Sequence, residues 1–364
     1  MKNIINEILI SINRQPFSVA YTCWRRYISK KEKYKETLYR YGYWYHRDKK
    51  SKDPVYFIFR FGLPGTGIGS IANTMHFCYE WAIKKNCIPI IDLEPEVVYK
   101  RGDLGVNNIW EYCFEPPMPI KEVLKQKNVY ISNLGLYSID REACYDINGN
   151  KKDMNIHLKY DSMYYKKLNK ISKNYLKLNA SLQEQVNEFI KVHFRDSRVL
   201  GVALREEFSL FSDVTRKDKD IAFYVDHPLV PDVEESIEIV KQMMEKWNCN
   251  KIFLSTMYEE SVCRFQQVFG DKVIFLQRQR KQLRTFKDLA KRVWNNSGDN
   301  EFSNNFFNSD EFKEQTVSYI KEVYILSNCQ CFIGAPSSIA ALCPVISGGD
   351  YEHFLFFEDR HHIS

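Results

Sequence analysis

The sequence predicts an α/β protein with two successive Rossmann-like domains that face each other across a cleft, preceded by a helical extension. Its 364 residues exceed what one compact core usually holds. Hydrophobic residues make up 44% of the chain and aromatic residues 15%, which is ample material for two cores. Short apolar runs rich in β-forming residues alternate with segments of helical periodicity, a pattern typical of parallel sheets covered by helices.

The first domain is expected over residues 54–195. Its opening unit is a strand, a glycine-rich turn, a helix and a buried strand, which together form a parallel β-α-β crossover. Another strand and a long helical region complete the domain. The strands are expected at 55–61, 88–93 and 127–132, and the helices at 71–86 and 162–193.

The second domain is expected over residues 196–364 and repeats this logic. Asp232 stands where a helix N-cap is needed, directly before an amphipathic run. Ligands of such domains bind at the carboxyl ends of the strands. The strands are expected at 199–204, 251–256, 272–277 and 329–334, the helices at 233–247, 257–269 and 311–328, and a long polar loop at about 278–310.

Residues 1–53 are expected to form a basic, helical extension. They carry 13 Lys or Arg against 5 Asp or Glu, whereas the whole chain has a net charge of +6. Seven tyrosines and two tryptophans, Trp24 and Trp44, are interleaved with these charges. This mixture suits an anionic membrane surface. A solvated extension packed on the protein is the alternative, and nucleic acid is not expected as a partner because no nucleic-acid-reading motif accompanies the charges.

Composition also excludes several classes of protein. No apolar run reaches the roughly 20 residues that span a bilayer, and the N-terminus lacks a signal-peptide pattern. We therefore expect a cytoplasmic protein, at most peripheral on the inner face of the cell membrane. The ten cysteines include no CxxC pair, so they are expected to be reduced, buried thiols and not zinc ligands or a redox site.

A glycine-rich loop joins the first strand to the first helix. Its glycines, including Gly67 and Gly69, allow backbone amides to approach an anion or hydroxyl at the helix N-terminus. The spacing is neither that of a dinucleotide-binding fingerprint nor that of a P-loop. A plain tight turn is an equally good interpretation of the same residues.

Two anion sites are predicted in the second domain. Arg205 follows the strand 199–204, where it could clamp a phosphate, although a salt bridge to Glu206 or Glu207 is the alternative. Ser337 and Ser338 follow Gly334 at the end of the strand 329–334 and open a helix. Their hydroxyls and the amides there can grip phosphate oxygens, or a serine can simply cap the helix. Two such sites in one domain favour a diphosphate ligand.

At these residues the sequence resembles a known family. The stretch 313–342, KEQTVSYIKEVYILSNCQCFIGAPSSIAAL, resembles the C-terminal nucleotide-sugar motif of fucosyltransferase-like GT-B glycosyltransferases. VLGVALREEF (199–208) is similar to their arginine-bearing strand motif. The segments 226–275 and 65–92 resemble the intervening helix–strand–helix and the N-terminal glycine loop. The combination is similar to uncharacterised bacterial members from polysaccharide (capsule or O-antigen) gene clusters, over roughly residues 55–360.

The resemblance implies an inverting, metal-independent glycosyltransferase. It would move a sugar, fucose or a related one, from a GDP-sugar to a hydroxyl of a surface-polysaccharide or other glycan acceptor, which can be lipid-linked. No cofactor or metal is expected. Arg205, together with Gly334, Ser337 and Ser338, would stabilise the negative charge of the leaving diphosphate. Glu322 would hold the ribose or base. The general base for the acceptor hydroxyl is left open among four carboxylates: Glu206, Glu207, Asp213 and Asp226.

Three further residues are assigned to the acceptor side or to loops. Asn73 lies beside the glycine loop, and Asp92 ends a strand, where it could meet acceptor hydroxyls or cap the strand. His227 lies in a loop with a matching H-P-x-x-P pattern, where ordering of the loop is the favoured role.

The sequence departs from the family pattern at Ala203, where the motif has histidine, and at Glu322, where it has aspartate. The main alternative is therefore a catalytically inactive nucleotide-sugar- or glycan-binding protein on the same fold. A nucleotide-sugar epimerase or dehydrogenase is disfavoured because the dinucleotide-binding fingerprint is absent.

Overall fold

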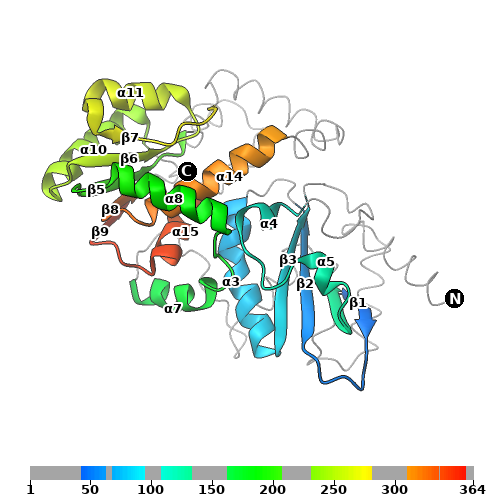
Figure 1. The fold of residues 1–364 in the computed structure, drawn as a ribbon. Coiled ribbons are helices and arrows are strands. Elements are labelled where there is room, and N and C mark those ends of the chain that lie inside the picture. Colours follow the sequence, from blue (N-terminus) through cyan, green and yellow to red (C-terminus); the bar gives the residue numbers. More distant parts are fainter. Residues whose placement is uncertain are drawn as a thin grey trace, which may run out of the picture. The chain divides into compact units, whose positions relative to one another are not determined.

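The computed structural model describes residues 42–62, 68–94, 108–132, 162–206, 231–280, 310–335 and 337–357. They form two compact units, each built on its own β-sheet. The α/β class predicted from the sequence is confirmed (Figure 1). The cleft expected between two domains stays a prediction.

The first unit is built on a sheet with the strand order β1-β4-β2-β3. Strand β2 (Val55–Gly62) lies between β3 (Cys87–Glu94) and β4 (Asn128–Ser132) and is parallel to both. Helix α3 (Ile68–Lys84) forms the crossover from β2 to β3, as predicted. The short helices α4 (Ile109–Cys113) and α5 (Ile120–Val123) precede β4, and α5 packs on the buried apolar residues of β2 and β4.

Strand β1 (Gly42–Arg47) corrects the prediction of a helix throughout residues 1–53. It pairs antiparallel with β4 at the edge of the first sheet. The run of aromatic residues in GYWYHR suits a strand, and the ring of Trp44 packs edge-on against Tyr130 with the ring centroids 5.5 Å apart. Trp44 is therefore part of the packed sheet. Residues 1–41 of the predicted extension, with Trp24, lie outside the described residues.

The second unit is built on a parallel sheet with the strand order β7-β6-β5-β8-β9. Strand β5 (Val199–Ala203) occupies the centre and is buried along its whole length. Its neighbours are β6 (Lys251–Ser255) and β8 (Cys331–Gly334), and the outer strands are β7 (Val273–Ile274) and β9 (His353–Phe356). Strand β9, which was not predicted, is short and only partly buried.

Helices cover both faces of the second sheet (Figure 1). On one face, α10 (Val233–Lys246) and α11 (Glu259–Phe269) bury their apolar stripes against β5, β6 and β8. Asp232 caps α10 as predicted, because its Oδ1 accepts the amide of Glu235 at 2.9 Å. On the other face lie α8 (Ala180–His193) and α14 (Asp310–Leu326), with Phe189 of α8 edge-on to Phe253 of β6.

The chain divides differently from the boundary expected near residue 195. Helices α7 (Ser162–Ser172) and α8 belong to the second unit. The reason is packing, because α8 contacts α14 and α7 contacts α15 (Ser338–Ser347). The first turns of α3, residues 68–73, also group with the second unit. None of the helices in the described ranges combines the length and the apolar character needed to cross a bilayer.

Candidate donor-binding site at the carboxyl edge of the second sheet

The residues predicted for diphosphate binding converge on one edge of the second sheet. Strands β5, β6 and β8 end side by side there, with Ala203 in register with Ser255 on one side and with Gly334 on the other. The chain beyond β5 stays in register for another step, since the amide of Leu204 donates to the carbonyl of Ser255 at 3.0 Å. Arg205, which follows, is therefore placed by the central strand of the sheet.

Arg205 and its neighbour Glu206 lie at the predicted strand end but make different contacts. The Nη1 of Arg205 lies 3.6 Å from the Sδ of Met257. Glu206 is only 4% exposed, and its Oε1 accepts the hydroxyl of Thr256. Both residues also border a narrow crevice that is too tight for a water molecule, together with Leu204, Pro231, Val233, Ser236, Ala335 and Phe357.

Glu322 forms a buried ion pair that the sequence did not indicate. Its carboxylate accepts two parallel hydrogen bonds from Arg278, from Nε at 2.8 Å and from Nη2 at 3.2 Å. The hydroxyl of Ser255 donates to the same carboxylate at 2.7 Å. The side chains of Arg278 and Glu322 are 9% and 1% exposed, respectively. The carboxylate predicted to hold ribose or base is thus engaged inside the protein.

Arg280 adds a third guanidinium to this edge. Its Nη2 donates to the carbonyl of Leu276 at 2.7 Å, and its side chain is 1% exposed. Burial lowers the pKa of Arg280, the nearby charge of Arg278 lowers it further, and Glu322 opposes both effects. Sequence reasoning assigned residues 278–310 to a polar loop. The signal that it missed is that Arg278 and Arg280 follow a strand, as Arg205 does.

Ser337 presents a buried hydroxyl at the N-terminus of α15. It occupies the N-cap position, and its carbonyl accepts the amide of Ala341 at 3.0 Å, but its side chain does not cap the helix. The residue is 8% exposed, and its Oγ makes no hydrogen bond to any described residue. A buried hydroxyl without a hydrogen bond destabilises the fold unless a ligand or a water molecule provides the partner. The capping alternative for Ser337 is therefore not what the structure shows.

Gly334 and Ser338 flank this hydroxyl. Gly334 ends β8, and a Cβ there would lie 2.8 Å from the ring of Phe332, so glycine permits this ring to pack closely against the end of the strand. Ser338 is the first residue of α15 and is partly exposed. Its carbonyl accepts the side-chain amide of Asn73 at 2.8 Å. Asn73, predicted for the acceptor side, is thus bound to the start of α15 within the second unit.

Gly69 has a packing role. A Cβ on Gly69 would lie 2.2 Å from the hydroxyl oxygen of Tyr319, so only glycine lets α3 approach α14 so closely. Burial raises the pKa of the Tyr319 hydroxyl. The charge of Arg205 lowers this pKa, and the charge of Glu322 raises it. The start of α3 therefore meets α14 within electrostatic reach of the candidate site.

The remaining predicted residues are not brought to this edge. Asp92 lies in β3 of the first unit and is 0% exposed, so an acceptor does not reach its carboxylate in this structure. Several others lie outside the described residues: Gly67, Glu207, Asp213, Asp226 and His227.

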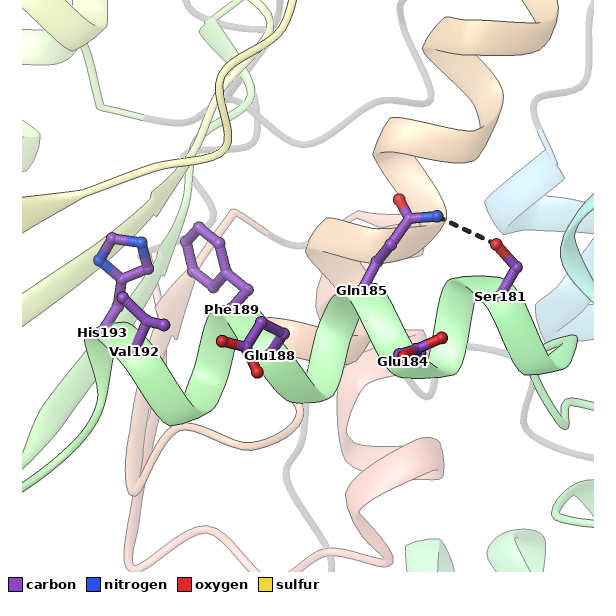
Figure 2. Close-up of a pocket in the computed structure, with 7 residues that line it drawn as sticks. All are labelled: Ser181, Glu184, Gln185, Glu188, Phe189, Val192 and His193. Atoms are coloured by element: carbon purple, nitrogen blue, oxygen red, sulfur yellow. Dashed lines mark hydrogen bonds between the residues drawn. The ribbon is translucent and has the colours of Figure 1, made fainter.

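A separate hollow runs along α8 (Figure 2) and does not suit a diphosphate. Its lining comes from one helix and includes the carboxylates of Glu184 and Glu188. Two acidic groups would repel an anionic ligand. Among the described residues there is also no cluster of three or more His, Cys, Asp or Glu that could hold a metal ion. The metal independence of the chemistry stays a prediction.

Comparison with known proteins shows distant structural likeness. No family model matches the chain, and no curated protein does. A fucosyltransferase NodZ from Bradyrhizobium is similar in structure, with 14% identity, a TM-score of 0.41, and coverage of 81% of this chain and 92% of that one. POFUT1 in complex with GDP is similar with 11% identity, a TM-score of 0.45, and coverage of 84% and 99%. Values this low do not identify the family of this chain.

Proposed function

We propose that this protein is a glycosyltransferase that binds a nucleoside diphosphate sugar at the carboxyl edge of its second sheet. The observation that carries the proposal is the Ser337 hydroxyl, which is buried at a helix N-terminus without a partner among the described residues. It lies on the turn beyond β8, and β8 is the neighbour of the strand that positions Arg205. A hydroxyl, a helix N-terminus and a guanidinium together are complementary to phosphate oxygens.

The chemistry follows from the charge of the leaving group. When the bond between sugar and diphosphate breaks, negative charge develops on the diphosphate, and the site must stabilise it. Arg205 would donate to phosphate oxygens from the end of β5. The amides at the start of α15 add the positive end of the helix dipole, and Ser337 and Ser338 can donate their hydroxyls. These groups do not depend on a metal ion.

The finer assignments rest on the sequence motifs at 199–208 and 313–342. They favour a GDP-linked donor carrying fucose or a related sugar, transfer with inversion, and a glycan hydroxyl as acceptor. Of the four carboxylates considered for the general base, Glu206 is buried and bonded to Thr256. To act as the base, a carboxylate oxygen of Glu206 would have to become accessible to the acceptor hydroxyl.

One observation favours the alternative of an inactive binding protein. Ala203 stands where the motif has histidine, and it is 1% exposed and brings no polar group to the edge. Hydrolysis of donor sugar separates the alternatives, since an active transferase slowly transfers its sugar to water, whereas an inactive protein only binds the donor.

The test compares Ser337→Ala with Ser172→Ala. Ser172, the last residue of α7, has another buried hydroxyl without a hydrogen bond to any described residue, but α7 contacts the opposite end of α15, where Asn169 donates to the carbonyls of Val345 and Ile346. Purified protein is screened for thermal shift and hydrolysis with GDP-, UDP- and CDP-sugars. We expect Ser337→Ala to weaken donor binding about tenfold, as loss of a hydrogen bond to a charged group does, and Ser172→Ala to leave it unchanged. Equal effects of the two variants, or no response of the wild type to any donor, would contradict the proposal.

A further inference from the structure

The guanidinium of Arg278 is held in place by some of its N–H groups, and others remain available to a ligand. An arginine side chain carries five N–H groups in a rigid fork. The Nε and Nη2 groups of Arg278 are bound, to Glu322 and to the carbonyl of Thr256, the latter at 2.8 Å. Its Nη1 makes no hydrogen bond to any described residue, which leaves two N–H groups available.

Arg278 and Arg205 are attached to the same short segment. Arg278 donates to the carbonyl of Thr256, and Arg205 lies against the sulfur of the next residue, Met257. Both guanidinium groups therefore lie at the carboxyl end of β6. Tyr319 is consistent with this placement: burial raises the pKa of its hydroxyl, the charge of Arg205 lowers it, and the charge of Glu322, the partner of Arg278, raises it.

The charges of the described residues at this edge favour an anion. Three guanidinium groups, those of Arg205, Arg278 and Arg280, lie near two buried carboxylates, those of Glu206 and Glu322. A third carboxylate, Glu259, lies 3.9 Å from Arg280 with a side chain that is 53% exposed, so water screens it. With Glu259 left out because water screens it, three guanidinium groups stand against two carboxylates, an excess of one positive charge that a phosphate group can balance.

We infer that Arg278 is a second arginine that binds the diphosphate of the donor, and that Glu322 is a positioning residue that holds Arg278. This inference rests on the proposed function and adds a binding residue to it. The Nη1 of Arg278 would donate to a phosphate oxygen from the side of β7, opposite the contact of Arg205. Because Glu322 and Thr256 fix the fork beforehand, little side-chain entropy is lost on binding.

The same geometry argues against direct contact between Glu322 and the ribose or base. Both carboxylate oxygens already accept hydrogen bonds, and the residue is 0% exposed. A nucleoside could reach them only by displacing Arg278 or Ser255. Glu322 therefore acts on the ligand through Arg278.

The test measures, for each variant, whether binding of the diphosphate part or of the nucleoside part of a nucleotide is weakened. Titration calorimetry on the full chain uses inorganic pyrophosphate, the nucleoside diphosphate that the wild type binds most tightly, and the matching nucleoside. Arg278→Gln should weaken the binding of pyrophosphate and of nucleoside diphosphate by a similar factor, about tenfold or more. It should leave the binding of the nucleoside unchanged. Arg278→Lys, which keeps the charge without the fork, should also bind more weakly and provides a second variant if the first fails to fold.

The matched control is Arg264→Gln. Arg264 forms a similar two-bond pair with Glu234 in the same unit, but on the exposed faces of α10 and α11. Glu322→Gln tests the positioning role by the sign of its effect. If Glu322 acted only through its charge, removing that negative charge beside an anion should strengthen pyrophosphate binding. If Glu322 holds Arg278 in place, the substitution should weaken pyrophosphate binding, and this is the result that we expect.

The outcomes separate this inference from the proposed function. Wild-type affinity in both Arg278 variants, or losses restricted to the nucleoside, would overturn the role of Arg278 and leave the donor site standing. Unchanged or stronger pyrophosphate binding in Glu322→Gln would overturn the positioning role. If the wild type binds no nucleoside diphosphate at all, both the proposed function and this inference fail.

Discussion

Replacement of Glu322 by alanine should destabilise the second unit strongly. The substitution leaves the guanidinium of Arg278, with 9% of its side chain exposed, without its carboxylate partner, and it removes the acceptor of the Ser255 hydroxyl. Breaking a buried ion pair from one side costs about 3–5 kcal/mol. That is a large part of the roughly 5–15 kcal/mol by which a domain is stable. For a unit of this size, the melting temperature should fall by about 10 °C.

The assay is urea denaturation of the wild type, Glu322→Ala, Glu234→Ala and the double variant Arg278→Met/Glu322→Leu. Glu234 makes the same two-bond contact to Arg264 on the surface, where water screens it, so its replacement should change the free energy of unfolding little. The double variant should recover most of the stability, because it leaves no charge unpaired. Equal losses for Glu322→Ala and Glu234→Ala, or a double variant no more stable than Glu322→Ala, would refute the reasoning.

Four other predictions concern activity, metal, membrane binding and pH. Arg205→Ala should lower turnover about a hundredfold, equivalent to about 3 kcal/mol of transition-state stabilisation, without a comparable loss of stability, and near-wild-type turnover would contradict its role. Activity should survive EDTA, whereas a loss that Mn²⁺ or Mg²⁺ restores would indicate metal-assisted transfer. In vesicle flotation, residues 1–53 should direct the protein to anionic vesicles in a salt-sensitive way, and equal binding to neutral vesicles would count against this. Burial raises the pKa of the Cys113 thiol to about 12, so the folded state holds this proton more tightly than the unfolded state and stability falls as pH rises above about 9. Between pH 8 and pH 10 the wild type should lose about 1 kcal/mol more than Cys113→Ala in urea titrations, and parallel losses would contradict this.

Much of the fold could be predicted because it depends on local pattern. The run VLGVAL is apolar throughout, as a strand buried on both faces must be, and it forms β5. The helix after Asp232 begins where its N-cap was predicted. The prediction was wrong at Gly42–Arg47, which was assigned to a helical extension and forms a strand. Pairing with β4, a tertiary interaction, decides the structure there.

The candidate site could be predicted only in part, for a physical reason. Arg205 and Ser337 each follow a strand, and the ends of neighbouring parallel strands meet at one edge, so their convergence follows from the topology. The pairing of Arg278 with Glu322 joins residues 44 positions apart and depends on how α14 packs on β6. No local spacing indicates such a contact. Because both carboxylate oxygens of Glu322 are engaged by this pairing and by Ser255, we propose for Glu322 the role of a support for Arg278 in place of a ligand of the nucleoside.

The measurement that tests the central claim most directly is calorimetric titration of the full chain with GDP, UDP and CDP, repeated with Ser337→Ala and Arg205→Ala. The account predicts that at least one nucleoside diphosphate binds the wild type at a single site. It also predicts that each variant weakens that binding about tenfold or more, because each removes a donor to the phosphate oxygens. Absence of binding by the wild type, or binding that neither variant affects, would contradict a donor site at the carboxyl edge of the second sheet.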